Sequence, residues 1–481
     1  MDIATVIEAA TQEFKQNLSQ QCQDLDLERL TPDLAAQISR GLKQALSTAG
    51  VAGFRTFLQG YEEEAPTLEI DGGLYRWKVV SPKRFLTPFG EMVLERNLYQ
   101  SDYGGTTHVP LDRQWGMEGE FATVEVRESV LFSCALMTPD ETAQLLQKSA
   151  LFHPSATAIQ HLLEETGVWL ECEGEALNEA IRSEDSIPEE TQTVVASLDG
   201  VQVRLNEKGV KQGQPIDRPG HPTGPETPTC FKRAMVGSLS LYGAPLEEYG
   251  IPLEEKEAPQ RLAARYVAEM PEEKSVTLKA RFEAEIRHVE AALPPSVNKV
   301  LLCDGERSLW TYAEKNPLFA DYQMLVDFYH TCEHLADAAE ALWGAGSPKA
   351  HQWYEEYRHK LLHEEKGADQ VLRSIDYYRR TRRFSKTRLE LIDTQRTFFQ
   401  RNKKRMNYAA FRQQGLPIGS GPVEAACKSL VKTRLCRSGM RWSWPGGQRI
   451  LQLRTYLKSG RWDAFWKQYK LRWPAHYDMA A

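Results

Sequence analysis

The sequence predicts an α/β protein whose central domain is a mixed β-sheet with helices on both faces. Two observations predict this fold class. Between residues 191 and 346, short apolar runs rich in β-branched residues are typical of buried strands, and they alternate with longer amphipathic segments typical of helices. Residues 347–414 then show helical patterns without any strand pattern, which indicates an inserted helical domain. With 41% hydrophobic residues in 481, the chain can bury a substantial core.

Three smaller regions precede this core. Residues 1–80 carry amphipathic helical patterns, and residues 81–137 have a period close to two that indicates a small β-rich module, including a strand in Glu120–Phe132. In residues 138–190, two short helical patterns flank a His-Pro step. This arrangement resembles a helix-turn-helix, which places a helix in the major groove of DNA. Two packed helices that connect domains fit the pattern equally well.

The first part of the core, residues 191–346, begins with three strands and continues with a mixture of helices and two further strands. Asp199 interrupts the first strand, and Asp304 ends the fourth. Residues 415–441 form the second part of the core, and residues 442–481 form a basic, aromatic tail that we expect to be helical. The expected strands are Val194–Leu205, Cys230–Gly243, Arg261–Met270, Lys299–Asp304 and Asp321–His330, and the expected helices are Ser275–Leu293 and His330–Gly344.

A glycine-rich turn opens the second part of the core. Pro422 is typical of the first helical position, so Gly421 is the expected N-cap and Glu424 the third helical residue. Helical spacing then puts Glu424, Lys428 and Lys432 on one face. An acid in a first turn also interacts favourably with the helix dipole, and a Glu and a Lys four residues apart form ordinary ion pairs, so this pattern alone does not identify a site.

The charge is strongly polarised along the chain. The net charge is −7, but residues 373–461 hold 22 Lys and Arg against four acids, which gives this segment +18 and the remainder −25. Tryptophans are interleaved with these cations. A basic segment of this kind is typical of a surface that binds phosphates and stacks on bases, although a solvated helical face is the common alternative.

Asp199, Asp304 and Glu424 stand where a strand interior, a strand end and a helix start can converge. Each can also be a turn or surface residue, and Asp199-Gly200 in particular fits a hairpin turn. Cleavage of a phosphodiester can use two Mg²⁺ ions roughly 4 Å apart, and Mg²⁺ prefers a few hard oxygen ligands. Three carboxylates followed by a cationic helix meet that requirement, with Mg²⁺ or Mn²⁺ as the expected cofactor and two ions per site.

Several blocks of the sequence also resemble those of a known family, the DDE transposases of bacterial insertion sequences. The blocks are SLDGVQV, VLLCDGERSLW, VDFYHTCEHLADAAEALWG and GLPIGSGPVEAACKSLVKTRLCRSGMRW, and the resemblance runs from about Thr87 to Trp466. It is closest to the ISKra group and looser to Mutator-like elements. The resemblance implies a ribonuclease-H-like core with a helical insertion, in which Asp199, Asp304 and Glu424 are the catalytic, metal-binding residues.

The resemblance also implies supporting roles for Asp327 and His330 in the DFYH block, through structure or DNA contact. Relatives often carry a cysteine pair in the N-terminal β-rich region, and this chain has none there. From their position on the basic helix, Lys428 and Lys432 are expected to face phosphates near the cut site. A tryptophan beyond them, Trp442 or Trp444, could stack on an unpaired base, although core packing is common for tryptophan. The expected DNA contacts are Lys428, Lys432, Arg434, Arg437, Arg441 and Trp442.

The expected function is therefore a transposase that hydrolyses phosphodiesters at the ends of an insertion sequence and transfers the 3′-hydroxyl strand to target DNA. Its partners are the terminal repeats, target DNA and, by analogy, further copies of itself. Two alternatives remain open. One is a catalytically silent DNA-binding protein derived from a transposase. The other is a zinc peptidase, because HTCEH fits H-x-x-E-H with His330, Glu333 and His334.

The composition also indicates a compartment. No apolar run is long enough to span a membrane, and acidic residues precede any apolar stretch at the N-terminus. Eight cysteines without a C-x-x-C pair fit reduced thiols better than a disulfide framework or a cysteine-rich zinc site. The expected location is the cytoplasm, with association with the nucleoid during activity.

Overall fold

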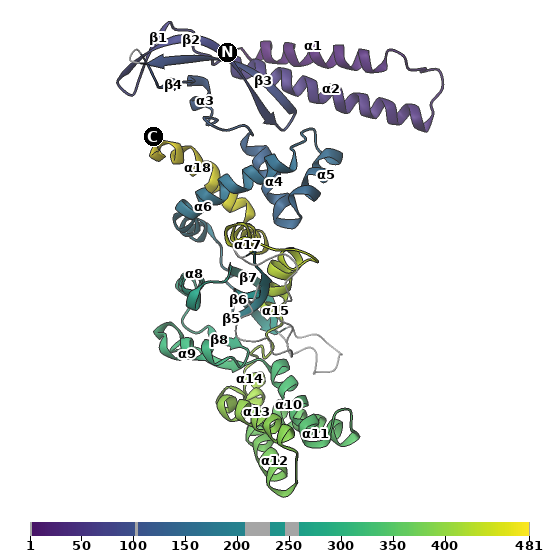
Figure 1. Ribbon diagram of the computed structural model, residues 1–481, viewed down its shortest axis with the longest axis vertical. Coiled ribbons are helices and arrows are strands. Elements are labelled where there is room, and N and C mark those ends of the chain that lie inside the picture. Colours follow the sequence, from purple (N-terminus) through teal and green to yellow (C-terminus); the bar gives the residue numbers. More distant parts are fainter. Residues whose placement is uncertain (1, 102–103, 207–230, 246–258, 481) are drawn as a thin grey trace. The chain divides into compact units, whose positions relative to one another are not determined.

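The computed structural model describes residues 2–101, 104–206, 231–245 and 259–480 (Figure 1). These residues divide into two compact units. The first contains Met1–Leu177 together with Ala464–Ala481, and the second contains Asn178–Asp463. Within the described residues, no helix is both long and apolar enough to cross a membrane.

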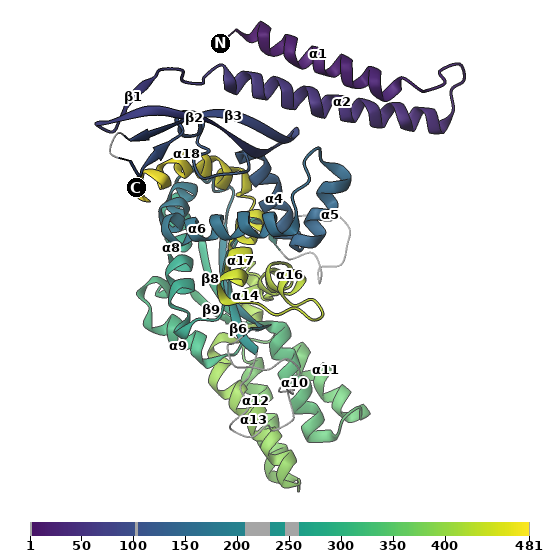
Figure 2. The ribbon, with the colours of Figure 1, turned by 45° about the horizontal axis from the view of Figure 1, so that its top comes forward.

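The first unit begins with two long helices, α1 (Ile3–Cys22) and α2 (Pro32–Gln59), which lie side by side in Figures 1 and 2. Asp2 and Thr31 cap their N-termini through side-chain oxygens. Small residues allow the two helices to approach closely. A Cβ on Gly53 would lie 3.2 Å from the Ala10 Cβ, so the contact is already near its steric limit.

A four-stranded antiparallel sheet follows, in the order β1-β2-β3-β4. Its apolar face buries Phe85, Met92 and Leu94 together with Leu58 of α2. The period-two pattern expected from residue 81 fits β2 and β3, but the sheet starts earlier, at Thr67, within the region 1–80 that was expected to be helical. The strands are β1 (Thr67–Ile70), β2 (Gly73–Thr87), β3 (Gly90–Ser101) and β4 (Thr107–His108).

The expected strand in Glu120–Phe132 is wrong. After the short helix α3 (Pro110–Gln114), residues Val124–Leu136 form helix α4. Val126, Val130 and Cys134 are fully buried, and their four-residue spacing is that of a helix face. The apparent alternation arose because charged residues fall between the valines at the start of the segment. Over the whole segment, a helix buries more of the apolar side chains on one face than a strand would.

Residues 138–190 form two helices, as predicted, but the second is much longer than its pattern suggested. Helix α5 (Pro139–Ser149) starts with a capping box between Thr138 and Glu141. Helix α6 (Ala156–Glu184) has 29 residues, and its start is stabilised by a hydrogen bond from the Ala158 amide to the Ser155 hydroxyl. Helix α18 (Trp462–Ala480) contributes Tyr469 to an aromatic cluster with Trp169 of α6.

The second unit contains the predicted mixed sheet, in the order β7-β6-β5-β8-β9. The β5–β6 and β6–β7 pairs are antiparallel, whereas β5–β8 and β8–β9 are parallel. Strand β9 ends at Val326 and not at His330, so it is shorter than expected. The strands are β5 (Thr193–Arg204), β6 (Phe231–Pro245), β7 (Pro259–Glu269), β8 (Asn298–Cys303) and β9 (Gln323–Val326).

Helices cover this sheet from two sides. In Figure 1, α8 and α15 lie on opposite sides of the sheet. Gly237 of β6 allows the α8 residue Phe282 to pack onto the sheet, since a Cβ there would lie 2.8 Å from the ring. The helices of the core are α8 (Val276–Ala292), α9 (Arg307–Lys315), α10 (Phe328–Trp343), α15 (Gly421–Ala426), α16 (Thr433–Leu435) and α17 (Trp444–Lys458).

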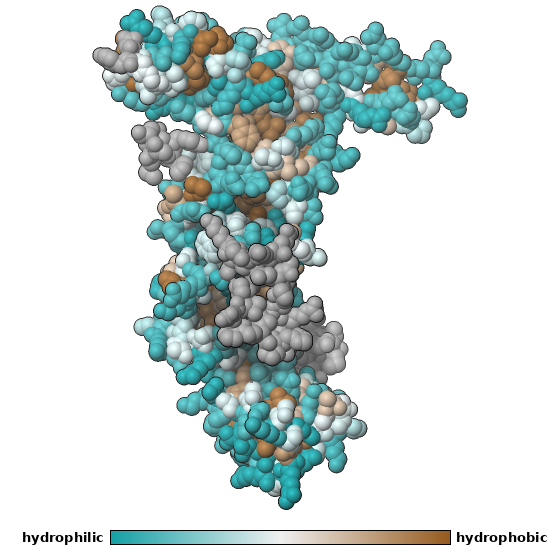
Figure 3. All heavy atoms as spheres, in the orientation of Figure 1, coloured by the Kyte–Doolittle hydropathy of each residue, from teal (hydrophilic) through white to brown (hydrophobic). Residues whose placement is uncertain are grey.

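The insertion between α10 and α15 consists of helices joined by turns and loops, and its described residues form no strand, as the sequence predicts. Its helices pack on α10 and bury Trp353, whose indole N–H donates to the Ser374 hydroxyl. The face of the insertion visible in Figure 3 is largely hydrophilic. The inserted helices are α11 (Pro348–His363), α12 (Gly367–Thr381), α13 (Lys386–Asn402) and α14 (Tyr408–Gln413).

Candidate active site

Asp199 and Asp304 occupy equivalent positions on neighbouring parallel strands. The last paired residues of β5 and β8 are Ala196 and Leu301, and each aspartate lies three residues further along its strand. Asp199 is not in a hairpin turn, because it lies inside β5 and pairs with Val236 of β6. The carboxyl ends of parallel strands meet at one edge of a sheet, which is where ligands bind in open α/β sheets.

One arginine nitrogen joins the two aspartates. The Nη2 atom of Arg233, on β6, lies 3.6 Å from Asp199 Oδ1 and 3.9 Å from Asp304 Oδ2. The two carboxylate oxygens are therefore no further apart than the sum of these distances. Both aspartates are about 30% exposed, so the pair faces solvent. The structure thus brings two of the three predicted acids together around a single positive charge.

Arg233 reaches the aspartates by crossing over Gly200. Any Cβ at Gly200 would overlap the Arg233 side chain, so the glycine next to Asp199 provides the space for this crossing. The other terminal nitrogen of Arg233 forms an ion pair with Glu306. Burial opposes the charge on Arg233, but the hydrogen bond with Glu306 and the nearby carboxylates raise the pKa of its guanidinium above the usual value.

Asp304 is held by the turn that follows it. Its Oδ1 accepts a 2.9 Å hydrogen bond from the Glu306 amide, and its backbone carbonyl accepts one of 2.9 Å from the Trp310 indole. Burial raises the pKa of Asp304, and repulsion from the Glu306 carboxylate acts in the same direction. A cation that binds this carboxylate would favour its charged form and so lower the pKa of Asp304 again.

Glu424 lies near the start of α15, but the local geometry differs from the expectation. The N-cap is Ser420 instead of Gly421, and the Ser420 hydroxyl donates a 3.0 Å hydrogen bond to Glu424 Oε1. Residues Cys427–Lys432 then form a π-helical turn, so regular α-helical spacing does not extend from Glu424 to Lys432. Among the ion pairs of the described residues, none joins Glu424 to Lys428.

Asp327 connects the loop before Glu424 to the sheet. Asp327 is fully buried, and its carboxylate accepts hydrogen bonds from the backbone amides of His330 and Ser420. Its own amide donates to the Cys303 carbonyl, next to Asp304, over 2.9 Å. Asp327 therefore caps α10 and also fixes the N-cap of α15, which is a structural role in support of the site.

Cys427, the first residue of the π-helical turn after α15, contacts β5. Its thiol lies against the Asp199 carboxylate, one helical turn beyond Glu424, and burial together with that carboxylate raises the pKa of the thiol. Glu424 itself is exposed. Among the described residues, no three His, Cys, Asp or Glu side chains are grouped as a metal site. The assignment of Glu424 as third metal ligand remains a prediction.

The two histidines of the HTCEH segment line a cleft and have separate polar partners. His330 Nδ1 lies 3.2 Å from Glu333 Oε2, while His334 stacks on Phe398 and its Nδ1 lies 2.6 Å from Gln395 Oε1. Burial lowers the pKa of His334. With no three-ligand group in the part of the chain that the structure describes, the zinc-peptidase alternative gains no support.

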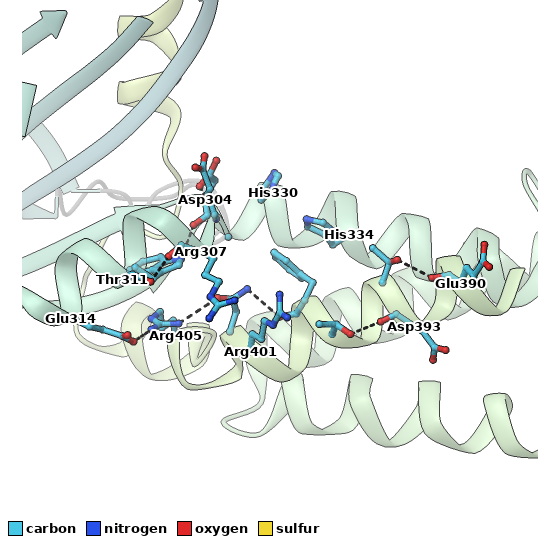
Figure 4. A pocket seen from close by; sticks show the side chains of 17 residues that line it. Asp304, Arg307, Thr311, Glu314, His330, His334, Glu390, Asp393, Arg401 and Arg405 are labelled. Carbon is cyan, nitrogen blue, oxygen red and sulfur yellow. Dashed lines mark hydrogen bonds and ion pairs between the residues drawn. The ribbon is translucent and has the colours of Figure 1, made fainter. Parts of the chain in front are cut away.

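The cleft lies beside Asp304 and has a volume of about 1130 Å³. Figure 4 shows Asp304 and His330 near one end, and Glu390 and Asp393 near the other. Arg307 and Arg401 are exposed along it. The insertion approaches the aspartate closely here, because Gly305 has no side chain and the Phe398 ring of α13 occupies that space.

The six predicted DNA contacts fall into two groups. Lys428, Lys432 and Arg437 are exposed, and Arg441 is partly buried. Arg434 is only 1% exposed, and its guanidinium lies over the Trp442 ring at 5.0 Å. The Trp442 indole donates to the Leu435 carbonyl over 3.0 Å. Arg434 and Trp442 therefore pack against each other in this structure, and this burial does not fit the expected phosphate contact of Arg434.

Sequence reasoning missed Arg233, Glu306 and Ser420. Only the glycine after Asp199 hinted at Arg233, since a glycine inside a strand often marks the close approach of another group. Glu306 and Ser420 carry no pattern of their own. Their roles depend on how the strand ends and the α15 loop meet.

No protein-family model matches the sequence, and no curated protein matches it. Among solved structures, the chain is similar to the Drosophila P element transposase strand transfer complex. The two chains share 9% sequence identity and align with a TM-score of 0.25, over 73% of this chain and 81% of that chain.

Proposed function

We propose that the protein is a DDE-type transposase, which cleaves phosphodiesters at the ends of an insertion sequence and transfers the 3′-hydroxyl strand to target DNA. The observation that carries this proposal is the pairing of Asp199 and Asp304 around one positive charge, just beyond the point where the parallel pairing of β5 and β8 ends. The resemblance of the sequence to such transposases agrees with the proposal.

The donor set fits Mg²⁺ or Mn²⁺. Both side chains are carboxylates, the ligands that these hard cations prefer, and a guanidinium nitrogen already stands within 4 Å of both. In this proposal Asp199 and Asp304 hold the metals, and Glu424 completes the set. Bound metals would activate the attacking hydroxyl and neutralise charge on the phosphate.

The protein's own residues orient these ligands. The Asp304 turn is fixed by the Glu306 amide and the Trp310 indole, and the helix with Glu424 is fixed through Asp327 and Ser420. Lys428, Lys432 and Arg437 are exposed cations that follow Glu424 along the chain, so we propose that they bind the DNA backbone.

The test uses the full chain and a DNA segment bracketed by the sequences that flank its own coding region. Asp199→Asn, Asp304→Asn and Glu424→Gln should each abolish metal-dependent cleavage while DNA binding persists. Asp369→Asn removes a half-exposed carboxylate of the insertion that pairs with Lys403 and should leave cleavage unchanged. Wild-type cleavage by any of the first three variants would refute that residue's role. A wild-type chain that binds this DNA without metal-dependent cleavage would instead be a DNA-binding protein.

A further inference from the structure

We propose that Arg233 is an internal counter-cation of the acidic site: it occupies the space between Asp199 and Asp304 before a divalent metal binds, and the metal displaces it. This inference rests on the proposed function in one respect only, that the two aspartates are metal ligands.

The Arg233 guanidinium occupies the space that a metal ion shared by Asp199 and Asp304 would need. One nitrogen of Arg233 faces Asp199 Oδ1 at 3.6 Å and Asp304 Oδ2 at 3.9 Å. An Mg²⁺ ion shared by these oxygens would have to approach each of them to about 2.1 Å. The ion and the guanidinium nitrogen would then compete for the same space and the same lone pairs. Their like charges add repulsion to the steric conflict.

Glu306 can hold the Arg233 guanidinium after a metal ion has displaced it. Its other terminal nitrogen pairs with Glu306, which lies beyond the two aspartates on the turn after β8. A displaced Arg233 can keep this partner while it leaves the aspartates. Glu306 also has a partner of its own in the Ser308 hydroxyl, which holds the carboxylate in place.

The glycine at position 200 makes room for the Arg233 side chain. Gly200 lies inside β5 beside Asp199, where a side chain would ordinarily be favoured, and its missing Cβ is where Arg233 crosses the strand. The φ angle of Gly200 is not positive, so the backbone conformation at this position does not itself require a glycine. Space for Arg233 is the physical reason for glycine at this position.

The consequence is a competition that lowers the metal affinity of the DNA-free protein. Removing a competitor from a site raises the apparent affinity by the reciprocal of the fraction of molecules in which the site was free of it. Arg233→Met keeps much of the side-chain volume and removes the charge. Gly200→Ala keeps the charge but forces the guanidinium out of its position. The second variant therefore separates displacement from a general loss of positive charge.

The experiment is a calorimetric titration of the full chain with Mn²⁺ in the absence of DNA. Arg233→Met and Gly200→Ala should each bind Mn²⁺ on the order of tenfold more tightly than wild type. Arg396→Met is the matched control, since the Arg396–Asp376 pair has similar exposure but lies in the insertion, and its Mn²⁺ affinity should equal that of wild type.

An unchanged or weaker Mn²⁺ affinity in either folded variant overturns the role of Arg233. Circular dichroism checks the fold, and if Arg233→Met does not fold, Gly200→Ala decides alone. Asp199→Asn and Asp304→Asn identify which idea has failed. If these two variants bind Mn²⁺ like wild type, the metal site of the proposed function is wrong. If they lose Mn²⁺ while Arg233→Met gains nothing, only the counter-cation is wrong.

Discussion

The carboxylate of Asp327 accepts a hydrogen bond from the backbone amide of Ser420, which lies 93 residues further along the chain. The other oxygen of the same carboxylate accepts the His330 amide over 2.6 Å. Two helices, α10 and α15, are thus capped by one buried side chain. Since Ser420 is also the N-cap of the helix that carries Glu424, the position of Glu424 depends on Asp327.

The variant Asp327→Asn should therefore lose both stability and catalysis. An asparagine side chain at this position can accept only one of the two backbone N–H groups and would present a donor to the other. Leaving a buried donor unsatisfied costs about 1–3 kcal/mol, so the free energy of unfolding in urea should fall by that amount. Metal-dependent DNA cleavage should fall further than stability alone explains. Asp337→Asn, at an exposed site of α10, is the control, and equal losses in both variants would contradict the capping role.

The turn after Asp304 gives a second prediction. Gly305→Ala places a Cβ in steric overlap with Cε2 of the Phe398 ring, so α13 must move away from the strand end. Overpacking of this kind typically costs about 1–3 kcal/mol in unfolding free energy. A smaller ring-free side chain in Phe398→Leu should restore most of that loss in the double variant. Urea unfolding of the four proteins in a double-mutant cycle measures the coupling, and strictly additive effects would show that the two residues are not in contact.

The two aspartates were predictable because each lies in or after an apolar strand, and parallel strands bring their carboxyl ends together. Arg233 was not, because the sequence does not tell which residue of an antiparallel neighbour crosses diagonally over Gly200. The π-helical turn after Glu424 was missed for a related reason. Its residues have ordinary helical propensities, and the extra residue per turn becomes visible only from the contacts that Cys427 and Leu430 make in the core. Burial of Arg434 was missed because arginine is usually exposed.

Asp185 provides a pH dependence of stability. It is 10% exposed and pairs with Arg265 and Arg461, each at 2.6 Å. Burial opposes its charge, but these two arginines lower the pKa of Asp185 below its usual value. The carboxylate therefore stabilises the folded state fully above the unfolded pKa of about 3.9, and this contribution is lost as the pH falls further through the folded pKa. The difference in unfolding free energy between wild type and Asp185→Asn should be constant from pH 7 to pH 5 and shrink below pH 4. A difference that stays the same down to pH 3 would contradict this pairing.

Lys432 and Arg434 are two residues apart and should behave in opposite ways. Lys432 is exposed, so Lys432→Ala should change the unfolding free energy by no more than about 0.5 kcal/mol. If Lys432 contacts a phosphate, this variant should bind DNA more weakly, and the slope of log K against log salt should decrease in magnitude by roughly 0.9. Arg434 is buried over Trp442, so Arg434→Ala should instead lower the unfolding free energy by roughly 2 kcal/mol. Its salt slope, measured on the folded fraction, should remain that of wild type, because the count of phosphate contacts does not change. A reduced slope for Arg434→Ala would mean that the guanidinium leaves Trp442 to meet DNA, and the sequence-based assignment would then be correct after all.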